Sequence, residues 1–232
     1  MFTKDLKQLA LDLKQQFHEN QPFPFIVIHG LFDDEKLRKA KNEIPYINKE
    51  KRSFDNFLEK KDMFHGEGLL ESSPESIQEV LRSLNSDEFV EFISEISGIN
   101  GLIKDDNFVG AGVHHIPSGG KLGIHIDFSR APWNKELFRR ANVLLYVNED
   151  WDDSWGGHLE MWDNSIRNGG KCVDKVTPNF NTLVIFGTKQ ESWHGHPHPL
   201  NCPPDRARQS FASYYYSPEP SNDSFDHDTI FD

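Results

Sequence analysis

The N-terminal part of the chain carries apolar residues mainly at helical spacing. Residues 2–17 interleave apolar side chains with charges every three or four positions, which predicts an amphipathic helix. Two further segments, 33–44 and 72–99, combine acidic or Ser/Pro start signals with the same spacing. A single run, 22–30, has the aromatic and β-branched content of a strand and ends in a glycine. This region therefore predicts helices around one strand.

A polar segment without a clear period, residues 48–72, lies between these predicted helices. Loops of this length inside compact domains are usually functional or mobile, so we interpret the segment as an irregular loop and a possible substrate lid. Solvated linkers seldom carry the large apolar side chains found here, which are Phe54, Phe57, Leu58 and Phe64. The alternative is that these side chains simply close one end of the helical layer.

Beyond residue 106 the pattern changes to short β-rich runs separated by Gly, Pro, Asn and Asp. The predicted strands are 107–116, 122–127, 141–147, 157–162, 171–176, 182–187, 193–199 and 207–216. Eight regularly spaced strands fit a double-stranded β-helix, or jelly roll. The fold expected is mainly β with flanking helices.

The expected domain organisation has one sizeable core, because 232 residues are too few for two typical domains with linkers. Residues 1–105 form an N-terminal helical and strand support region, and residues 106–217 form the jelly roll. The acidic, turn-rich tail, 218–232, is expected to be frayed or loosely docked.

Composition narrows the possible partners. A formal net charge of -12 would repel nucleic-acid phosphates and anionic lipid heads, and no local basic patch offsets it. The longest apolar runs are strand-length, far below the roughly 20 residues that span a bilayer. The first helix is not a signal peptide, and the two cysteines, Cys172 and Cys202, suit a reducing compartment. We expect a soluble, cytoplasmic protein without nucleic-acid or membrane partners.

A candidate metal site begins with two residues of one predicted strand. His125 and Asp127 are two positions apart, which places both side chains on one face of that strand. A second histidine would complete the two-His, one-carboxylate triad that leaves three positions open on Fe(II). The candidates are His194, His196 and His198, which alternate on one strand face, so spacing does not choose among them.

Arg208 begins the last predicted strand, fourteen residues after His194. A guanidinium there is suited to bind a carboxylate bidentately, and a dicarboxylate such as 2-oxoglutarate needs such a group inside a barrel. Taken alone, an arginine on the surface of the strand would be the simpler interpretation. The order of His-x-Asp, a later His and then Arg-x-Ser is more specific.

Several segments together resemble the prolyl 4-hydroxylase branch of the Fe(II)- and 2-oxoglutarate-dependent dioxygenases. These segments are HIPSGGKLGIHID, ANVLLYVNEDWDDSWGGHLEMW, SWHGHP and RQSFASYYYS, and the resemblance covers about residues 107–217. It implies a jelly-roll fold in which His125, Asp127 and His194 hold the iron. His196 and His198 would then lie at the rim or behind the ligands.

The resemblance also implies the contacts with the co-substrate. Arg208 and Tyr146 would bind the distal carboxylate, with Ser210 beside them. His115, ten residues before the first iron ligand, would face the co-substrate, and His114 would point away. Arginine stands here where many collagen-type members of the family have lysine.

The activity implied is the hydroxylation of an unactivated carbon with Fe(II), 2-oxoglutarate and O₂, and ascorbate is a further candidate cofactor. Asp127 favours hydroxylation over halogenation, since related halogenases have a small residue at this position. The substrate that the resemblance favours is a prolyl residue in a protein or peptide. The alternatives are a free amino acid, sugar or other small metabolite, and, from another class, a cupin-like metal-binding isomerase or binding module without a co-substrate.

Overall fold

The computed structural model describes residues 1–218 and 226–232, and within them the helices gather in the N-terminal part of the chain. The α-helices are α1 (Leu6–Glu19), α2 (Asp34–Glu43), α3 (Glu75–Leu84) and α4 (Asp87–Ser97). Short 3-10 helices are η1 (Ile44–Tyr46), η2 (Asp153–Trp155) and η3 (Ile166–Asn168). All three predicted helical segments are confirmed. The segment 72–99 forms two helices because the Ser86 side chain caps a new one by accepting the N–H of Phe89.

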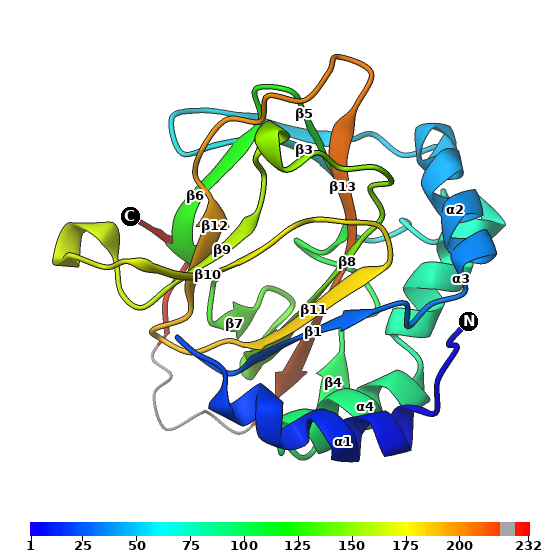
Figure 1. The fold of residues 1–232 in the computed structure, drawn as a ribbon. Helices are drawn as coiled ribbons and strands as arrows, with labels where there is room; N and C mark the ends of the chain where they lie inside the picture. The colour runs from blue at the N-terminus through cyan, green and yellow to red at the C-terminus, as the bar shows by residue number, and fades with distance from the viewer. Residues whose placement is uncertain (219–225) are drawn as a thin grey trace.

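The strands form one rolled sheet. They are β1 (Phe25–His29), β2 (Arg52–Asp55), β3 (Glu59–Phe64), β4 (Ile103–Lys104), β5 (Gly112–Pro117), β6 (Lys121–Ile126), β7 (Arg130–Ala131), β8 (Asn134–Tyr146), β9 (Leu159–Trp162), β10 (Cys172–Val176), β11 (Thr182–Gly187), β12 (Trp193–His196), β13 (Ala207–Ser217) and β14 (Ile230–Phe231). The main path runs β1-β11-β8-β13-β5-β3-β6-β12-β9-β10, and every pairing in it is antiparallel. The sheet curls into a nearly closed jelly roll (Figure 1). The predicted fold class is confirmed.

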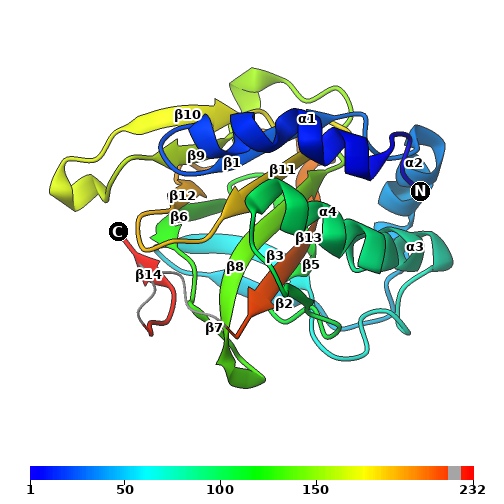
Figure 2. The same ribbon diagram turned by 90° about the horizontal axis from the view of Figure 1, so that it is seen from below.

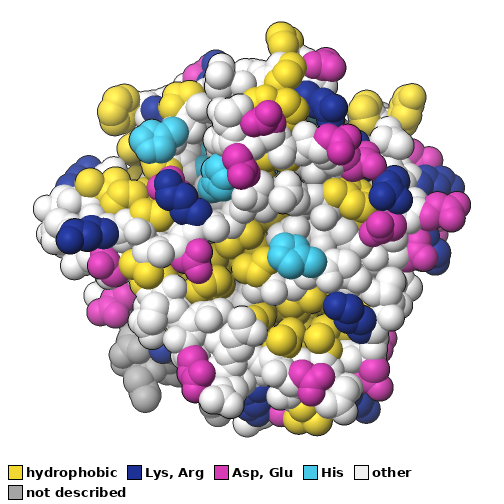
Figure 3. All heavy atoms as spheres, in the orientation of Figure 1, with side chains coloured by type: hydrophobic (Ala, Val, Ile, Leu, Met, Phe, Trp, Pro, Cys, Tyr) yellow, Lys and Arg dark blue, Asp and Glu magenta, His cyan; other side chains and the backbone are white. Residues whose placement is uncertain are grey.

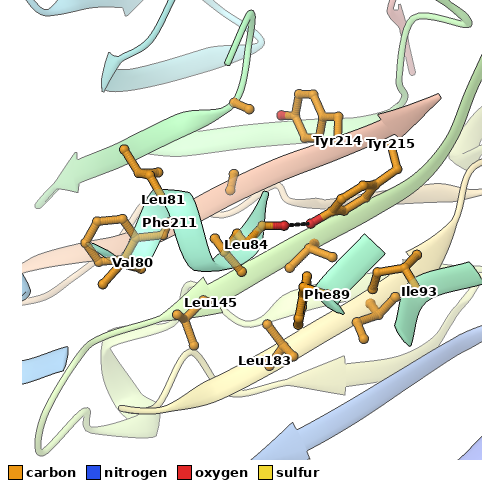
Figure 4. Packing of buried hydrophobic residues seen from close by; sticks show 14 of the residues in the cluster. Val80, Leu81, Leu84, Phe89, Ile93, Leu145, Leu183, Phe211, Tyr214 and Tyr215 are labelled. Atoms are coloured by element: carbon orange, nitrogen blue, oxygen red, sulfur yellow. Dashed lines mark hydrogen bonds between the residues drawn. The ribbon is translucent and has the colours of Figure 1, made fainter. Parts of the chain in front are cut away.

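The helices cover one face of this sheet, where β1, β11, β8 and β13 lie (Figure 2). Figure 4 shows how α3 and α4 pack there: Leu84 and Phe89 meet Leu145 and Phe211 of the strands in one buried cluster. The Tyr215 hydroxyl donates to the Leu84 carbonyl at 2.5 Å, which satisfies a helix-end acceptor inside the core. The helical layer therefore covers the outer face of these strands and leaves their inner face to line the interior of the barrel.

The segment 48–72 is not the irregular loop that its polarity predicted. Strands β2 and β3 form an antiparallel hairpin, and β3 also pairs with both β5 and β6. Met63 is the residue of β3 that is buried, and it lies opposite His114 of β5. The hairpin thus bridges two strands of the barrel, and residues from the N-terminal support region enter the same sheet as the jelly roll.

The last residues are docked rather than frayed. Strand β14 pairs with β6, with Phe231 opposite His125. The Asp232 carboxylate accepts the backbone N–H groups of Ile166 and Arg167 at the start of η3. Of the two expectations for the tail, frayed or loosely docked, residues 226–232 follow the docked one, and residues 219–225 lie outside the described part of the chain.

The surface view agrees with the acidic composition. On the face shown in Figure 3, Lys and Arg side chains lie among Asp and Glu rather than in one basic patch. Within the described residues no helix combines the length and apolarity needed to cross a membrane. Both cysteines are free thiols, and Cys202 is buried.

Candidate metal centre and anion pocket

Three metal-ligating side chains meet where β6 and β12 lie side by side. His125 and His194 are directly opposite each other in this pair, and Asp127 follows the end of β6. The Asp127 carboxylate lies 3.5 Å from Nε2 of His125 and 3.3 Å from Nε2 of His194, and one ligand atom of each residue lies within 4.8 Å of the others. Two imidazoles and one carboxylate at this spacing suit a facial triad for a divalent metal.

Backbone carbonyls orient both imidazoles. Nδ1 of His125 lies 2.9 Å from the Gly123 carbonyl, and Nδ1 of His194 lies 2.8 Å from the Ser192 carbonyl. Because a carbonyl only accepts, each Nδ1 carries the proton and each Nε2 offers a lone pair to the centre. Burial, followed by the neighbouring His194, lowers the pKa of His125, which favours the neutral form that a metal requires.

Two side chains of β8 hold the Asp127 carboxylate. Its Oδ2 accepts from Asn142 Nδ2 at 2.6 Å and from Arg139 Nη2 at 3.2 Å. Arg139 is itself fixed under the Tyr214 ring, 3.4 Å from the centroid. Burial, the largest single influence, would raise the pKa of Asp127, but the charge of Arg139 and the contacts with His194 and His125 together outweigh it and hold that pKa well below its usual range. The carboxylate is therefore ionised, and Oδ1 is not used by Arg139 or Asn142.

Arg208 lies in the same interior, on β13. It is 4 % exposed, its Nε donates to the Gly157 carbonyl at 2.6 Å, and its Nη2 donates to the Tyr146 hydroxyl at 2.8 Å. Ser210 is directly opposite Tyr146 in the β13–β8 pair, so both side chains project to one face. The Ser210 hydroxyl is buried and has no hydrogen-bond partner within residues 1–218 and 226–232. No carboxylate in the described part of the chain pairs with Arg208, and such a buried guanidinium suits a bound anion.

The triad and Arg208 share one chamber of about 80 Å³ inside the barrel. An outer cleft of about 340 Å³ adjoins it, and His125, Asp127 and Lys61 line both. The hairpin β2–β3 forms one wall of the cleft and strand β14 another, where the Phe231 ring lies 5.3 Å from that of His125. A metal in the chamber would thus have the anion pocket behind it and a route to solvent in front.

Comparisons with known proteins agree with this geometry. Residues 111–216 match the family model described as the 2OG-Fe(II) oxygenase superfamily. The matched residues are the β core of this chain. The match contains the whole triad and Arg208, and the resemblance stated from the sequence is confirmed at this level.

Among curated proteins, the prolyl 3,4-dihydroxylase OGFOD1 of Ostreococcus tauri is 24 % identical over 176 residues. The alignment covers 71 % of this chain and 32 % of that protein, so the chain spans about a third of the length of this relative.

Two solved structures share the fold of the superfamily core. A prolyl hydroxylase from Trichoplax adhaerens, in complex with a hypoxia inducible factor peptide fragment, gives a TM-score of 0.65 at 17 % identity, covering 91 % of this chain and 90 % of that one. A Pseudomonas putida prolyl-4-hydroxylase gives 0.59 at 16 % identity, covering 90 % and 97 %.

The two histidines of β5 point the opposite way from what the resemblance implied. His115 does not face the chamber: it is opposite Gln209 in the β5–β13 pair, and Gln209 Nε2 donates to its Nδ1 at 3.0 Å on the outer face. His114, expected to point away, is opposite Ser210 and lines the chamber. Burial lowers the pKa of His114 to about 3, so its ring is neutral.

His196 and His198, the two histidines that follow His194, differ in burial. His196 is 3 % exposed and lines the chamber beside Arg208, so it is not a rim residue. His198 is exposed, as a rim position would be. The sequence also missed Arg139 and Asn142, because nothing in the spacing along the chain indicates that β8 crosses next to Asp127.

The residues present fit an iron ion with a dicarboxylate co-substrate. The triad supplies two nitrogen ligands and one oxygen ligand from a buried site. The Ser210 hydroxyl and the His196 ring are buried and find no hydrogen-bond partner in the described structure, which points to a polar occupant of the chamber.

Proposed function

We propose that this chain is an Fe(II)- and 2-oxoglutarate-dependent dioxygenase that hydroxylates an unactivated C–H bond, with a prolyl residue of a protein or peptide as the favoured substrate. The observation that carries the proposal is one buried chamber holding a His-Asp-His triad next to an arginine that has no carboxylate partner among the described residues. A metal-binding module that needs no co-substrate would not require a buried arginine such as Arg208 beside the metal ligands.

In this proposal each site residue has a distinct task. His125, Asp127 and His194 hold Fe(II), and Arg139 and Asn142 keep the Asp127 carboxylate ionised and oriented. Arg208, Tyr146 and Ser210 bind the distal carboxylate of 2-oxoglutarate, which Arg208 neutralises.

Bound iron supplies the chemistry of O₂ activation, in which 2-oxoglutarate becomes succinate and CO₂ and the substrate C–H becomes C–OH. The protein positions the carbon and keeps water away from the metal, and the burial of His125 and His194 serves this exclusion.

The favoured substrate class rests on the outer cleft and on the relatives. The cleft opens to solvent in front of the triad, and its lining mixes charged side chains with the rings of Phe54 and Phe231, which suits an extended peptide segment. The curated relative is a prolyl 3,4-dihydroxylase, and one structural neighbour holds a peptide fragment. A free amino acid or other small metabolite is the alternative that the experiment must separate.

The proposal also includes a cytoplasmic location and ascorbate as a further cofactor. The reducing cytoplasm suits a chain whose cysteines, Cys172 and Cys202, are both free thiols. Ascorbate is a candidate cofactor of the reaction. Turnover measured with and without ascorbate tests that part separately from the iron and 2-oxoglutarate requirement.

The test is a panel assay with the purified protein, Fe(II), 2-oxoglutarate and O₂. Proline-containing peptides, free amino acids and sugars are offered in parallel, succinate is quantified, and products are examined by mass spectrometry for the gain of one oxygen atom. We expect succinate and hydroxylated peptide in equal amounts with at least one prolyl peptide. Coupled turnover on a free metabolite alone would reject the peptide substrate, and no 2-oxoglutarate consumption with any substrate would reject the dioxygenase.

A further inference from the structure

His196 is a buried imidazole without a partner. It lies at the end of β12, it is 3 % exposed, and neither Nδ1 nor Nε2 has a hydrogen bond among the described residues. Roughly 90 % or more of buried polar groups are paired, and an unpaired one lowers stability. An apolar side chain at this position would avoid that cost, so the ring calls for an explanation beyond packing.

The location of His196 points to a ligand. It lines the chamber together with His125 on the metal side and Arg208 on the anion side. An imidazole ring carries an N–H in both its neutral and its protonated form, so His196 offers a donor to the chamber.

We propose that His196 is a binding residue for 2-oxoglutarate, donating a hydrogen bond to the co-substrate in the stretch between the iron and Arg208. The inference rests on the proposed function and extends it, since the resemblance placed His196 at the rim or behind the ligands. A bound dicarboxylate brings acceptor oxygens to the wall on which the unpaired ring lies, so that binding removes the cost of the unpaired N–H.

Three substitutions separate this role from simple packing. His196→Leu keeps an apolar side chain of comparable size but removes the donor. His196→Asn and His196→Gln each retain an N–H donor, placed near the positions of Nδ1 and Nε2 respectively. His198→Leu is the matched control, because His198 is exposed two residues further along and does not line the chamber.

The measurement is calorimetric titration of 2-oxoglutarate into the Mn(II)-loaded protein under argon, where no turnover occurs. We expect His196→Leu to bind 2-oxoglutarate roughly ten- to a hundredfold more weakly than the wild type, the loss of one hydrogen bond to a charged group. Mn(II) affinity and the unfolding temperature should stay close to wild type. His196→Asn or His196→Gln should recover part of the affinity, and His198→Leu should bind like the wild type.

A second measurement needs no variant, and it decides the matter if the variants fail to fold. In the diamagnetic Zn(II) protein, the ¹⁵N signals of the His196 ring should shift when 2-oxoglutarate is added. Unchanged ring signals, or unchanged affinity in His196→Leu, would overturn the role of His196 alone. Equal losses of Mn(II) affinity and 2-oxoglutarate affinity, without recovery in either amide variant, would assign His196 to structure instead. No 2-oxoglutarate binding by the wild type would overturn the proposed function with it.

Discussion

Single residues show where sequence spacing is informative and where it fails. His125 and Asp127 were predictable as a pair because alternation along one strand fixes their common face. For His115 and His114 the same alternation shows only that they point in opposite directions. The choice between them depends on pairing with β13, where His114 meets Ser210. Tertiary pairing also brings Arg139 to Asp127, so no local pattern could indicate it.

The role of Arg208 leads to a prediction with a matched control. Arg208→Ala should weaken 2-oxoglutarate binding by roughly ten- to a hundredfold, because a buried, charge-assisted contact contributes about 1.5–3 kcal/mol. Fe(II) affinity should change far less. Arg206→Ala should leave both unchanged, since Arg206 donates to the Glu149 carbonyl outside the chamber. The KM for 2-oxoglutarate and the Fe(II) affinity of each variant check this, and a larger effect at Arg206 would contradict the assignment.

Asp105 gives a prediction about pH and stability. Burial raises its pKa from 3.8 to about 6, although it accepts the backbone N–H groups of Val109 and Asn107. The folded protein then binds a proton that the unfolded chain has already lost. Protonated Asp105 therefore contributes its full share of the unfolding free energy below the pKa of the unfolded chain, about 4. This contribution is lost as pH rises from about 4 to about 6.

Denaturant unfolding at several pH values tests this sign. As pH rises from about 4 to about 6, the unfolding free energy of the wild type should fall relative to that of Asp105→Asn. Asp106→Asn, at the exposed neighbouring position, should show no such trend. A difference independent of pH would contradict the raised pKa of Asp105.

At the scale of elements, the strands with clear apolar patterns were predictable and the polar ones were not. All eight strands expected after residue 106 are present, because each has enough β-branched or aromatic residues between turn signals. The hairpin β2–β3 was missed since β3, EKKDMF, buries one residue and is held by pairing with β5 and β6. Strand β14 has two residues and exists through its pairing with β6.

The hairpin β2–β3 lies in the segment that the sequence predicted as a possible substrate lid. Phe54 lines the outer cleft, whereas Phe57 is 87 % exposed at the tip. Phe54→Ser should weaken coupling, raising the succinate formed per hydroxylated product, while 2-oxoglutarate and Fe(II) affinities stay unchanged. Phe57→Ser is the control and should stay coupled. Wild-type coupling in Phe54→Ser, or loss of folding in that variant, would return the hairpin to a purely structural role.

At the scale of the whole molecule, the fold separates support from chemistry. Helices α1, α3 and α4 pack on the outer face of the sheet where β8 and β11 lie, and the triad lies inside the barrel, where β6 and β12 pair. Only the tertiary arrangement brings the hairpin and the C-terminal strand β14 together as walls of one cleft. Sequence patterns therefore could not predict that the hairpin and β14 lie together in front of the candidate metal site.

In the proposed function, His125, Asp127 and His194 hold Fe(II) beside a site for 2-oxoglutarate. Its most direct test is anaerobic titration of the Fe(II)-loaded protein with 2-oxoglutarate, followed by visible charge-transfer absorption of the chelate. We predict that the absorption saturates at one equivalent in the wild type and in His198→Ala, and is absent in His194→Ala. No absorption in the wild type, or equal absorption in His194→Ala, would contradict this account.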